Sequence, residues 1–244
     1  HLGALANNEH LAQLSESLLL EVDESFRDPS GHWIGTSGRL RVLVYDSNKL
    51  SENDLPKSLK ELADPKWKGQ LGWAPSNASF QAHVSGLRHL WGEEETRSWL
   101  QGVINNSPKT YPKNSPQVKA ADEGSLTIGW VNHYYLHRLN KDETAAKNYS
   151  FPGKDAGNLM MLAGAAVSKH SEQTKEAETL LRWLVSEEAQ LYFSEKNFEY
   201  PTRPGIALNK NVSAVPIERL SEIEQSDLSD LGPTRRMLQE LGLQ

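Results

Sequence analysis

Two kinds of segment alternate along this sequence and together predict an α/β fold. Short runs of apolar and β-branched residues, such as residues 39–46, are typical of buried strands. Between them lie longer runs in which apolar residues recur every three or four positions, as in residues 79–91, and this spacing is typical of amphipathic helices. Because the two kinds alternate along the whole chain, an α/β architecture is indicated.

The N-terminal part of the chain is expected to form one helix, one loop and one strand. Residues 2–20 carry leucines at helical spacings, including positions 5, 11, 14 and 18, which predicts a helix. Residues 27–38 contain one proline and three glycines and are expected to form a loop. Residues 39–46 read RLRVLVYD, and their apolar, β-branched character predicts a strand.

The clearest predicted helix covers residues 79–91. Its apolar residues form one face, and Gly92 follows it as a typical helix-ending residue. Upstream, residues 58–63 are expected to form a short helix that stops before Pro65, because the residue before a proline disfavours the helical conformation. Residues 70–74 are expected to form a strand.

The same alternation continues to the end of the chain. Residues 172–185 form a long amphipathic stretch, with Ser171 as the expected N-cap. Residues 209–230 are loop-rich enough to serve as a long connection. The other expected elements are strands at 126–131 and 159–167 and helices at 93–103, 115–123, 133–139, 187–195 and 234–241.

Composition excludes several classes of protein. The net charge is −6, from 26 basic and 32 acidic residues without a basic stripe, so nucleic acid is not an expected partner. Cysteine is absent, which excludes disulfides, thiolate metal sites and cysteine nucleophiles but leaves both reducing and oxidising compartments open. The chain starts at His1 without an initiator methionine or a signal peptide, and we expect that sequence is missing upstream.

Two adjacent tyrosines, Tyr134 and Tyr135, follow the strand predicted at 126–131. Tyrosine is large and often half-buried, so packing alone would account for the pair. The functional interpretation is a ferric site. Ferric ion is a hard, highly charged acid that prefers anionic oxygen, and coordination can remove a phenol proton whose ordinary pKa is about 10. Two neighbouring phenolates that lean the same way could hold one such ion.

Residues 75–79, Pro-Ser-Asn-Ala-Ser, precede the helix predicted at 79–91. Free backbone N–H groups and the positive helix end would face an anion there, although a plain N-cap explains the same residues. His133 and His137 are four positions apart, a spacing that can place two imidazoles on one helix face for zinc. No HExxH pattern surrounds them and no third ligand is indicated.

The chain as a whole resembles the bacterial ferric-iron-binding proteins that serve ABC importers. The segment 131–137 matches the Asn-x-Tyr-Tyr motif of that family. The stretch 64–69, DPKWKG, is shared with related receptors for other ligands, so it indicates the fold, whereas the double tyrosine points to iron. The other segments that carry the resemblance are residues 35–42 with Tyr45, 62–63, 74–80, 113–115 and 164–167.

The resemblance implies a site for Fe³⁺ and a synergistic anion such as phosphate or carbonate. Tyr134 and Tyr135 would be the metal ligands. Arg39 would add positive charge, although an ordinary ion pair at a strand end is an equal explanation. Some family members add a His and a Glu ligand from the first lobe, which this chain does not allow us to assign. The residues implied in the anion site are Ser76, Asn77, Ala78, Ser79, Asn114 and Asn132.

The resemblance also implies a periplasmic-binding-protein-like fold with two crossovers and a ligand cleft between two lobes. Residues 1–40 and 166–214 would form an incomplete lobe one, and residues 41–165 and 215–244 would form lobe two with the Tyr-Tyr motif. The expected protein is a monomer and not an enzyme. It would lie in the periplasm or on the cell surface as a lipoprotein and would deliver iron to an ABC transporter permease. A binding protein for thiamine, a polyamine or an organic anion, and a zinc hydrolase using His133 and His137, are the alternatives.

Overall fold

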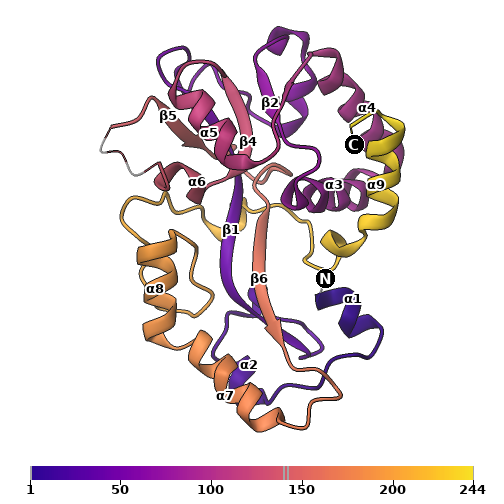
Figure 1. The fold of residues 1–244 in the computed structure, drawn as a ribbon, viewed down its shortest axis with the longest axis vertical. Helices are drawn as coiled ribbons and strands as arrows, with labels where there is room; N and C mark the ends of the chain where they lie inside the picture. Colours follow the sequence, from indigo (N-terminus) through magenta and orange to yellow (C-terminus); the bar gives the residue numbers. More distant parts are fainter. Residues whose placement is uncertain (1, 140, 142, 244) are drawn as a thin grey trace. The chain divides into compact units, whose positions relative to one another are not determined.

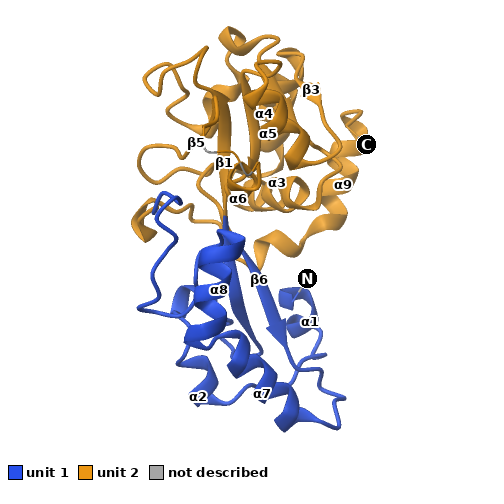
Figure 2. Ribbon diagram, turned by 60° about the vertical axis from the view of Figure 1, so that its left-hand side comes forward, with its two compact units in different colours: residues 1–39, 161–214 blue, residues 40–160, 215–244 orange. Residues whose placement is uncertain are grey.

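A computed structural model describes residues 2–139, 141 and 143–243. The chain divides into two compact units, coloured separately in Figure 2: unit 1 comprises residues 1–39 and 161–214, and unit 2 comprises residues 40–160 and 215–244. The lobes predicted from sequence change at 40/41, 165/166 and 214/215, whereas the units change at 39/40, 160/161 and 214/215. Unit 2 contains both tyrosines of the motif.

Strand β1 (Trp33–Asp46) is longer than the sequence predicted and begins inside the expected loop 27–38, so the end of that loop was assigned wrongly. The strand, labelled in Figure 1, starts in unit 1 and ends in unit 2, and the colours of Figure 2 distinguish the two parts. The glycines suggested a turn, but Gly35 has a packing role. A Cβ placed there would lie 2.7 Å from the carbonyl oxygen of Phe26, so a glycine permits this close approach within a strand.

The sheet of unit 2 has the strand order β3-β2-β4-β1-β5. β4 runs antiparallel to β1, with Arg41 opposite Asn132 and Leu43 opposite Trp130. Because side chains alternate along a strand, these four residues share one face of the sheet. The strands predicted at 70–74 and 126–131 are confirmed, and two polar or very short strands were missed. The other four strands in this order are β2 (Leu71–Trp73), β3 (Lys109–Thr110), β4 (Ile128–Asn132) and β5 (Ala146–Tyr149).

Helix α3 (Ala78–Trp91) confirms the strongest helix prediction and covers the face that carries Trp130. Asn77 caps its N-terminus, and Gly92, with φ 86°, ends it in a backbone conformation that glycine adopts readily. The ring of Phe80 lies 5.0 Å from that of Trp130, centroid to centroid. The other helices of unit 2 are α4 (Glu93–Asn105), α5 (Asn114–Asp122), α6 (Tyr134–His137) and α9 (Leu231–Glu240), with 3₁₀ turns at Leu59–Ala63, Pro65–Trp67, Ile217–Arg219 and Asp227–Ser229.

Unit 1 does not contain the continuous helix predicted at 2–20. The chain forms α1 (Leu2–Asn7) and α2 (Glu16–Leu19) instead, because residues between them bond elsewhere. The N–H of Ala12 donates to Val167 O and that of Leu14 donates to Gly31 O. A core between these segments and the later helices contains Leu14, Leu18, Val22, Ile34, Val167, Leu181 and Val185.

The later helices of unit 1 are α7 (Thr174–Leu184) and α8 (Glu187–Asn197), close to prediction. The N-cap of α7 is Gln173 rather than the expected Ser171, whose hydroxyl instead accepts a bond from the N–H of Gln173. β6 (Met160–Ala166) confirms the strand predicted at 159–167; it pairs with β1, is buried at its start and is partly exposed farther on. Within the described residues, no helix has both the length and the apolar character needed to cross a membrane.

Asn158 fastens the segment after residue 215 to the rest of unit 2. It is fully buried, and its amide donates to the carbonyls of Phe151, Gly153 and Arg219 at 2.9, 3.2 and 3.1 Å. Asn158→Ala leaves these carbonyls without that donor, so we expect the free energy of unfolding to fall by about 3 kcal/mol in urea denaturation. Asn48→Ala, at an exposed turn, is the control and should change it by less than about 0.5 kcal/mol. Equal effects of the two variants would contradict this assignment.

Candidate metal and anion site

Tyr134 and Tyr135 begin helix α6 directly after strand β4. Their ring centroids lie 4.5 Å apart and the ring planes are inclined by 37°. Tyr134 is buried, with 5% of its surface exposed, and Tyr135 is half-buried. The Tyr135 side chain is hydrogen-bonded to Tyr134 and to Asn114. The two phenol groups therefore converge, which is the geometry that a shared cation requires.

The surroundings of Tyr135 act on its proton in both directions. Burial raises its pKa above the ordinary value, and the hydrogen bond with Tyr134 and the charge of that neighbour raise it further. The hydrogen bond with Asn114 and the positive charge of Arg138 lower the pKa. Without a bound cation, Tyr135 therefore keeps its proton at neutral pH, and a ligand that takes the phenolate must displace it.

Arg41 is the charged centre of this region, and sequence reasoning missed it. Its side chain is fully buried, and burial lowers its pKa to about 9 even though the charges of Tyr134 and Tyr135 favour its protonated form. One Nη donates to Asn132 Oδ1 at 3.0 Å, and the other donates to the Trp130 carbonyl at 3.0 Å. The available signal was an arginine between two apolar residues, Leu40 and Val42, of a predicted buried strand, since a buried charge needs buried partners.

Ser79 joins the anion loop to this arginine. The hydroxyl lies 3.3 Å from the Nη1 of Arg41 and 3.4 Å from the Nδ2 of Asn114, both of which donate to it. Asn77 Oδ1 accepts from the backbone N–H and the hydroxyl of Ser79, at 3.0 and 2.5 Å. Asn132, in turn, donates to the Tyr134 hydroxyl at 3.4 Å. The network thus connects the helix start, the guanidinium and one of the phenols within unit 2.

The remaining predicted anion residues occupy different positions. Ser76 and Ala78 are exposed at the start of α3, where the first-turn N–H groups of a helix lack intrahelical acceptors. Free backbone N–H groups of such residues can bind an anion. Arg39 belongs to unit 1, so its part in the anion site stays a prediction, and Arg41 is the arginine that the structure places among the predicted amide side chains.

Arg138 is a second residue that sequence reasoning missed. Its guanidinium carbon lies 4.3 Å from the ring centroid of Tyr134 and 5.3 Å from that of Tyr135. A cation over a tyrosine ring is attracted by the ring's electron density. The sequence could have indicated this contact, because Arg138 follows Tyr134 by four residues in a helical segment, and side chains at that spacing share a face.

His133 and His137 are not arranged as a zinc-binding pair, because His133 already uses a ring nitrogen in a hydrogen bond. His133 is buried, and its Nδ1 accepts a hydrogen bond of 3.0 Å from the N–H of Leu40, which fastens the start of α6 to β1. His137 is partly buried, and burial lowers its pKa. Among the residues that the structure describes, no group of three His, Cys, Asp or Glu side chains is placed to hold a metal ion.

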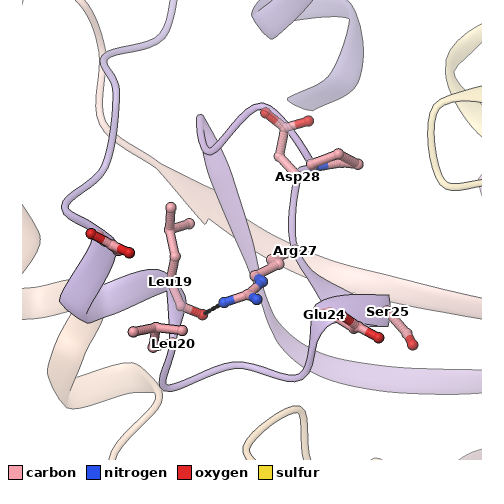
Figure 3. A pocket seen from close by; sticks show the side chains of 8 residues that line it. Leu19, Leu20, Glu24, Ser25, Arg27 and Asp28 are labelled. Atoms are coloured by element: carbon pink, nitrogen blue, oxygen red, sulfur yellow. Dashed lines mark hydrogen bonds between the residues drawn. The ribbon is translucent and has the colours of Figure 1, made fainter.

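A cavity of about 500 Å³ lies in unit 1. Figure 3 shows Arg27 crossing it to donate to the carbonyl of Leu19, and the carboxyl-bearing side chains of Glu24 and Asp28 at its margin. The Asp28 carboxylate is already bonded to the backbone N–H and the ring of His32, at 2.9 and 3.1 Å. No predicted site residue lines this cavity.

Comparison with known sequences gives several similar curated proteins. The major ferric iron-binding protein of Neisseria meningitidis is 32% identical over 215 residues, which are 86% of this chain and 65% of that protein. The Fe(3+)-binding periplasmic protein of Serratia marcescens is 34% identical over 219 residues, which are 88% of this chain and 64% of that protein. The chain thus spans slightly less than two thirds of the length of these relatives.

Comparison with solved structures supports the same relationship. Iron-bound HitA from Pseudomonas aeruginosa has a TM-score of 0.91 at 32% identity, over 99% of this chain and 79% of that one. Apo FutA2 from Synechocystis has a TM-score of 0.86 at 27% identity, over 100% and 81% of the two chains. This likeness confirms the predicted periplasmic-binding-protein-like α/β fold. The family model for bacterial extracellular solute-binding proteins matches residues 2–221, and the chain belongs to that family.

Proposed function

We propose that this protein binds ferric iron through the phenolates of Tyr134 and Tyr135 together with a synergistic anion. The observation that carries the proposal is the convergence of two adjacent phenol groups, 4.5 Å apart between ring centroids, beside a buried guanidinium. The names of the similar proteins from Neisseria meningitidis and Serratia marcescens, which specify ferric iron, agree with it. Ferric ion is the transported cargo.

The charges of the site favour a cation and an anion bound together. Two phenolates offset two of the three charges of ferric ion, and the anion offsets the rest. Arg41 brings a buried positive charge that is hydrogen-bonded to neutral groups, namely Ser79, Asn114, Asn132 and a carbonyl. A buried charge surrounded by neutral partners favours a nearby counter-ion. Phosphate or carbonate fits this position, as does a carboxylate; one similar structure is described as containing iron and citrate.

The anion site that we propose consists of the loop and helix start at Ser76, Asn77, Ala78 and Ser79 with the amides of Asn114 and Asn132. The connected hydrogen bonds from Asn77 through Ser79 to Asn114 and Arg41 support this assignment. Arg39 is retained as a further candidate. Any ligands from outside unit 2 would complete the metal shell.

After capture, we propose that the protein delivers iron as a monomer to the permease of an ABC importer. It would act outside the cytoplasm, in the periplasm or as a cell-surface lipoprotein, and would catalyse no reaction. The solute-binding family and the periplasmic name of the Serratia marcescens relative support this role. Acidification or reopening of the site would release the metal, since each phenolate regains its proton when iron leaves.

The alternative of a cationic organic ligand fits the site less well. A thiamine-binding periplasmic protein of Salmonella typhimurium is 26% identical over 165 residues, which are 66% of this chain and 48% of that protein. Thiamine and polyamines are organic cations that do not coordinate a phenolate as a ferric ion does. They would therefore gain no metal–ligand bond and would meet the buried charge of Arg41, which repels them.

The first test replaces both phenols. The double variant Tyr134→Phe, Tyr135→Phe keeps the ring packing but removes both anionic oxygens, so we expect loss of the visible ferric–phenolate absorption band. Ferric affinity, measured by competition with a chelator, should fall by more than about 1,000-fold, because each lost ligand–metal contact costs several kcal/mol. Tyr192→Phe, which removes an exposed hydroxyl in unit 1, is the matched control and should keep both properties. Full ferric affinity in the double variant would refute the proposed function.

The second test concerns pH. The pKa of Tyr135 is raised, so its neutral form dominates at neutral pH and iron must displace the proton. Ferric affinity should therefore fall as pH falls, by up to about tenfold per pH unit for each displaced proton. Asn114→Ala removes a hydrogen bond that lowers this pKa, so the pH of half-loading should move upward. Ultraviolet titration of the metal-free variant should show the same direction for the phenol. A downward shift in either measurement would contradict this explanation.

A further inference from the structure

His83 is a buried histidine that is not one of the residues proposed to bind iron or the anion. It lies on α3, four residues after Ser79, with none of its surface exposed. Its Nε2 lies 2.7 Å from the carbonyl oxygen of Ala156. Because a carbonyl only accepts, Nε2 carries the proton and donates, and the neutral ring presents Nδ1 as an acceptor. Burial, followed by the charge of Arg41, lowers the pKa of His83 to about 3, so the ring stays neutral.

Arg41 has a complementary unsatisfied atom. Its two Nη atoms donate to Ser79, Asn114, Asn132 and the Trp130 carbonyl. Its Nε and the Nδ1 of His83 are both buried, and among the residues that the structure describes neither has a hydrogen-bond partner. One is a donor and the other an acceptor, and a buried polar group without a hydrogen-bond partner destabilises the folded state.

Both side chains lie close to the ring of Trp130. The His83 ring centroid lies 4.6 Å from that of Trp130, and the Arg41 guanidinium carbon lies 5.1 Å from it. Ser79 and His83 are four residues apart on α3, so they share a helix face, and Arg41 donates to Ser79. Trp130 and Arg41 also lie on the same face of the sheet by the β1–β4 register. The unpaired donor and the unpaired acceptor are therefore both buried against the same ring, and the charge of Arg41 acts on His83.

We propose that His83 is a positioning residue for Arg41, acting through one buried water that accepts from the Arg41 Nε–H and donates to the His83 Nδ1. Buried waters commonly join groups that are otherwise unsatisfied. This arrangement fixes the third nitrogen of the guanidinium and keeps its Nη atoms directed at the amides of the anion site. A protonated histidine would repel Arg41, and an apolar residue would leave Nε unpaired. The inference rests on the proposed function insofar as Arg41 attracts the anion.

Packing alone is the competing explanation for His83. A phenylalanine would meet Trp130 in a similar tilted ring contact and would bury no unmatched nitrogen. The distinguishing property is thus the state of the Arg41 Nε–H, which a packing role does not affect. That proton is observable by nitrogen-15 NMR of the whole metal-free chain, and its resonance is identified by its disappearance in Arg41→Lys.

The primary experiment measures solvent exchange of this proton in His83→Phe and His83→Gln. We expect exchange at least about tenfold faster in His83→Phe, and near-normal protection in His83→Gln, whose amide can both donate and accept. Val84→Ala is the control, because it removes packing from the same turn of α3 without touching a polar atom. Unchanged exchange in a folded His83→Phe variant would overturn the proposal, as would equal acceleration in Val84→Ala.

A second measurement links the contact to ligand binding. Inorganic phosphate affinity of the ferric-loaded chain should fall about tenfold in His83→Phe and be largely restored in His83→Gln. If the wild-type chain binds no ferric ion while Nε–H protection still depends on His83, the positioning role stands and the proposed function fails. If ferric and phosphate binding are intact but Nε–H protection is independent of His83, the positioning role fails alone. If His83→Phe does not fold, solvent exchange of the Arg41 Nε–H is compared between His83→Gln and His83→Asn instead. Loss of its protection in both of these variants would overturn the proposal.

Discussion

The need to satisfy the fully buried charge of Arg41 organises the site in unit 2. A guanidinium removed from water must find hydrogen-bond acceptors, and here these come from a helix start, a strand end and the backbone. None of these acceptors is a carboxylate. The charge is therefore hydrogen-bonded by these acceptors yet not neutralised by them, which supports the anion site that we propose at the same residues. A salt bridge at this position would remove that attraction.

The two phenols place the proposed metal ligands next to the proposed anion site. Asn132 bonds to both Arg41 and Tyr134, and Asn114 bonds to both Arg41 and Tyr135. Each amide has an oxygen that accepts from arginine and a nitrogen that donates, so it can serve both neighbours at once. A change in the charge of the phenols thus alters the electrostatic environment of Arg41. The cation and the anion proposed for this site are therefore coupled through the two shared amides.

Sequence patterns predicted much of the fold and part of the site. The helix at 79–91 was clear because its apolar spacing, cap and terminal glycine all agree, whereas residues 2–20 failed because tertiary bonds from Ala12 and Leu14 overrode a leucine pattern. Tyr134 and Tyr135 are adjacent in sequence and were recognisable. Arg41 was not, because its role depends on the pairing of β1 with β4, and that register brings together residues about ninety positions apart.

The construction of the site on one unit has a mechanistic consequence. The phenols, the helix start and Arg41 belong to the same sheet and to the helices packed on it, so their mutual geometry is set by the folding of unit 2. His133, the residue before Tyr134, adds to this by two hydrogen bonds with Leu40 of β1: its N–H donates to the Leu40 carbonyl, and its Nδ1 accepts from the Leu40 N–H. A preorganised donor set loses little freedom when its ligand arrives. Unit 2 would therefore present the proposed donor set in its binding geometry before any ligand from outside it completes the metal shell.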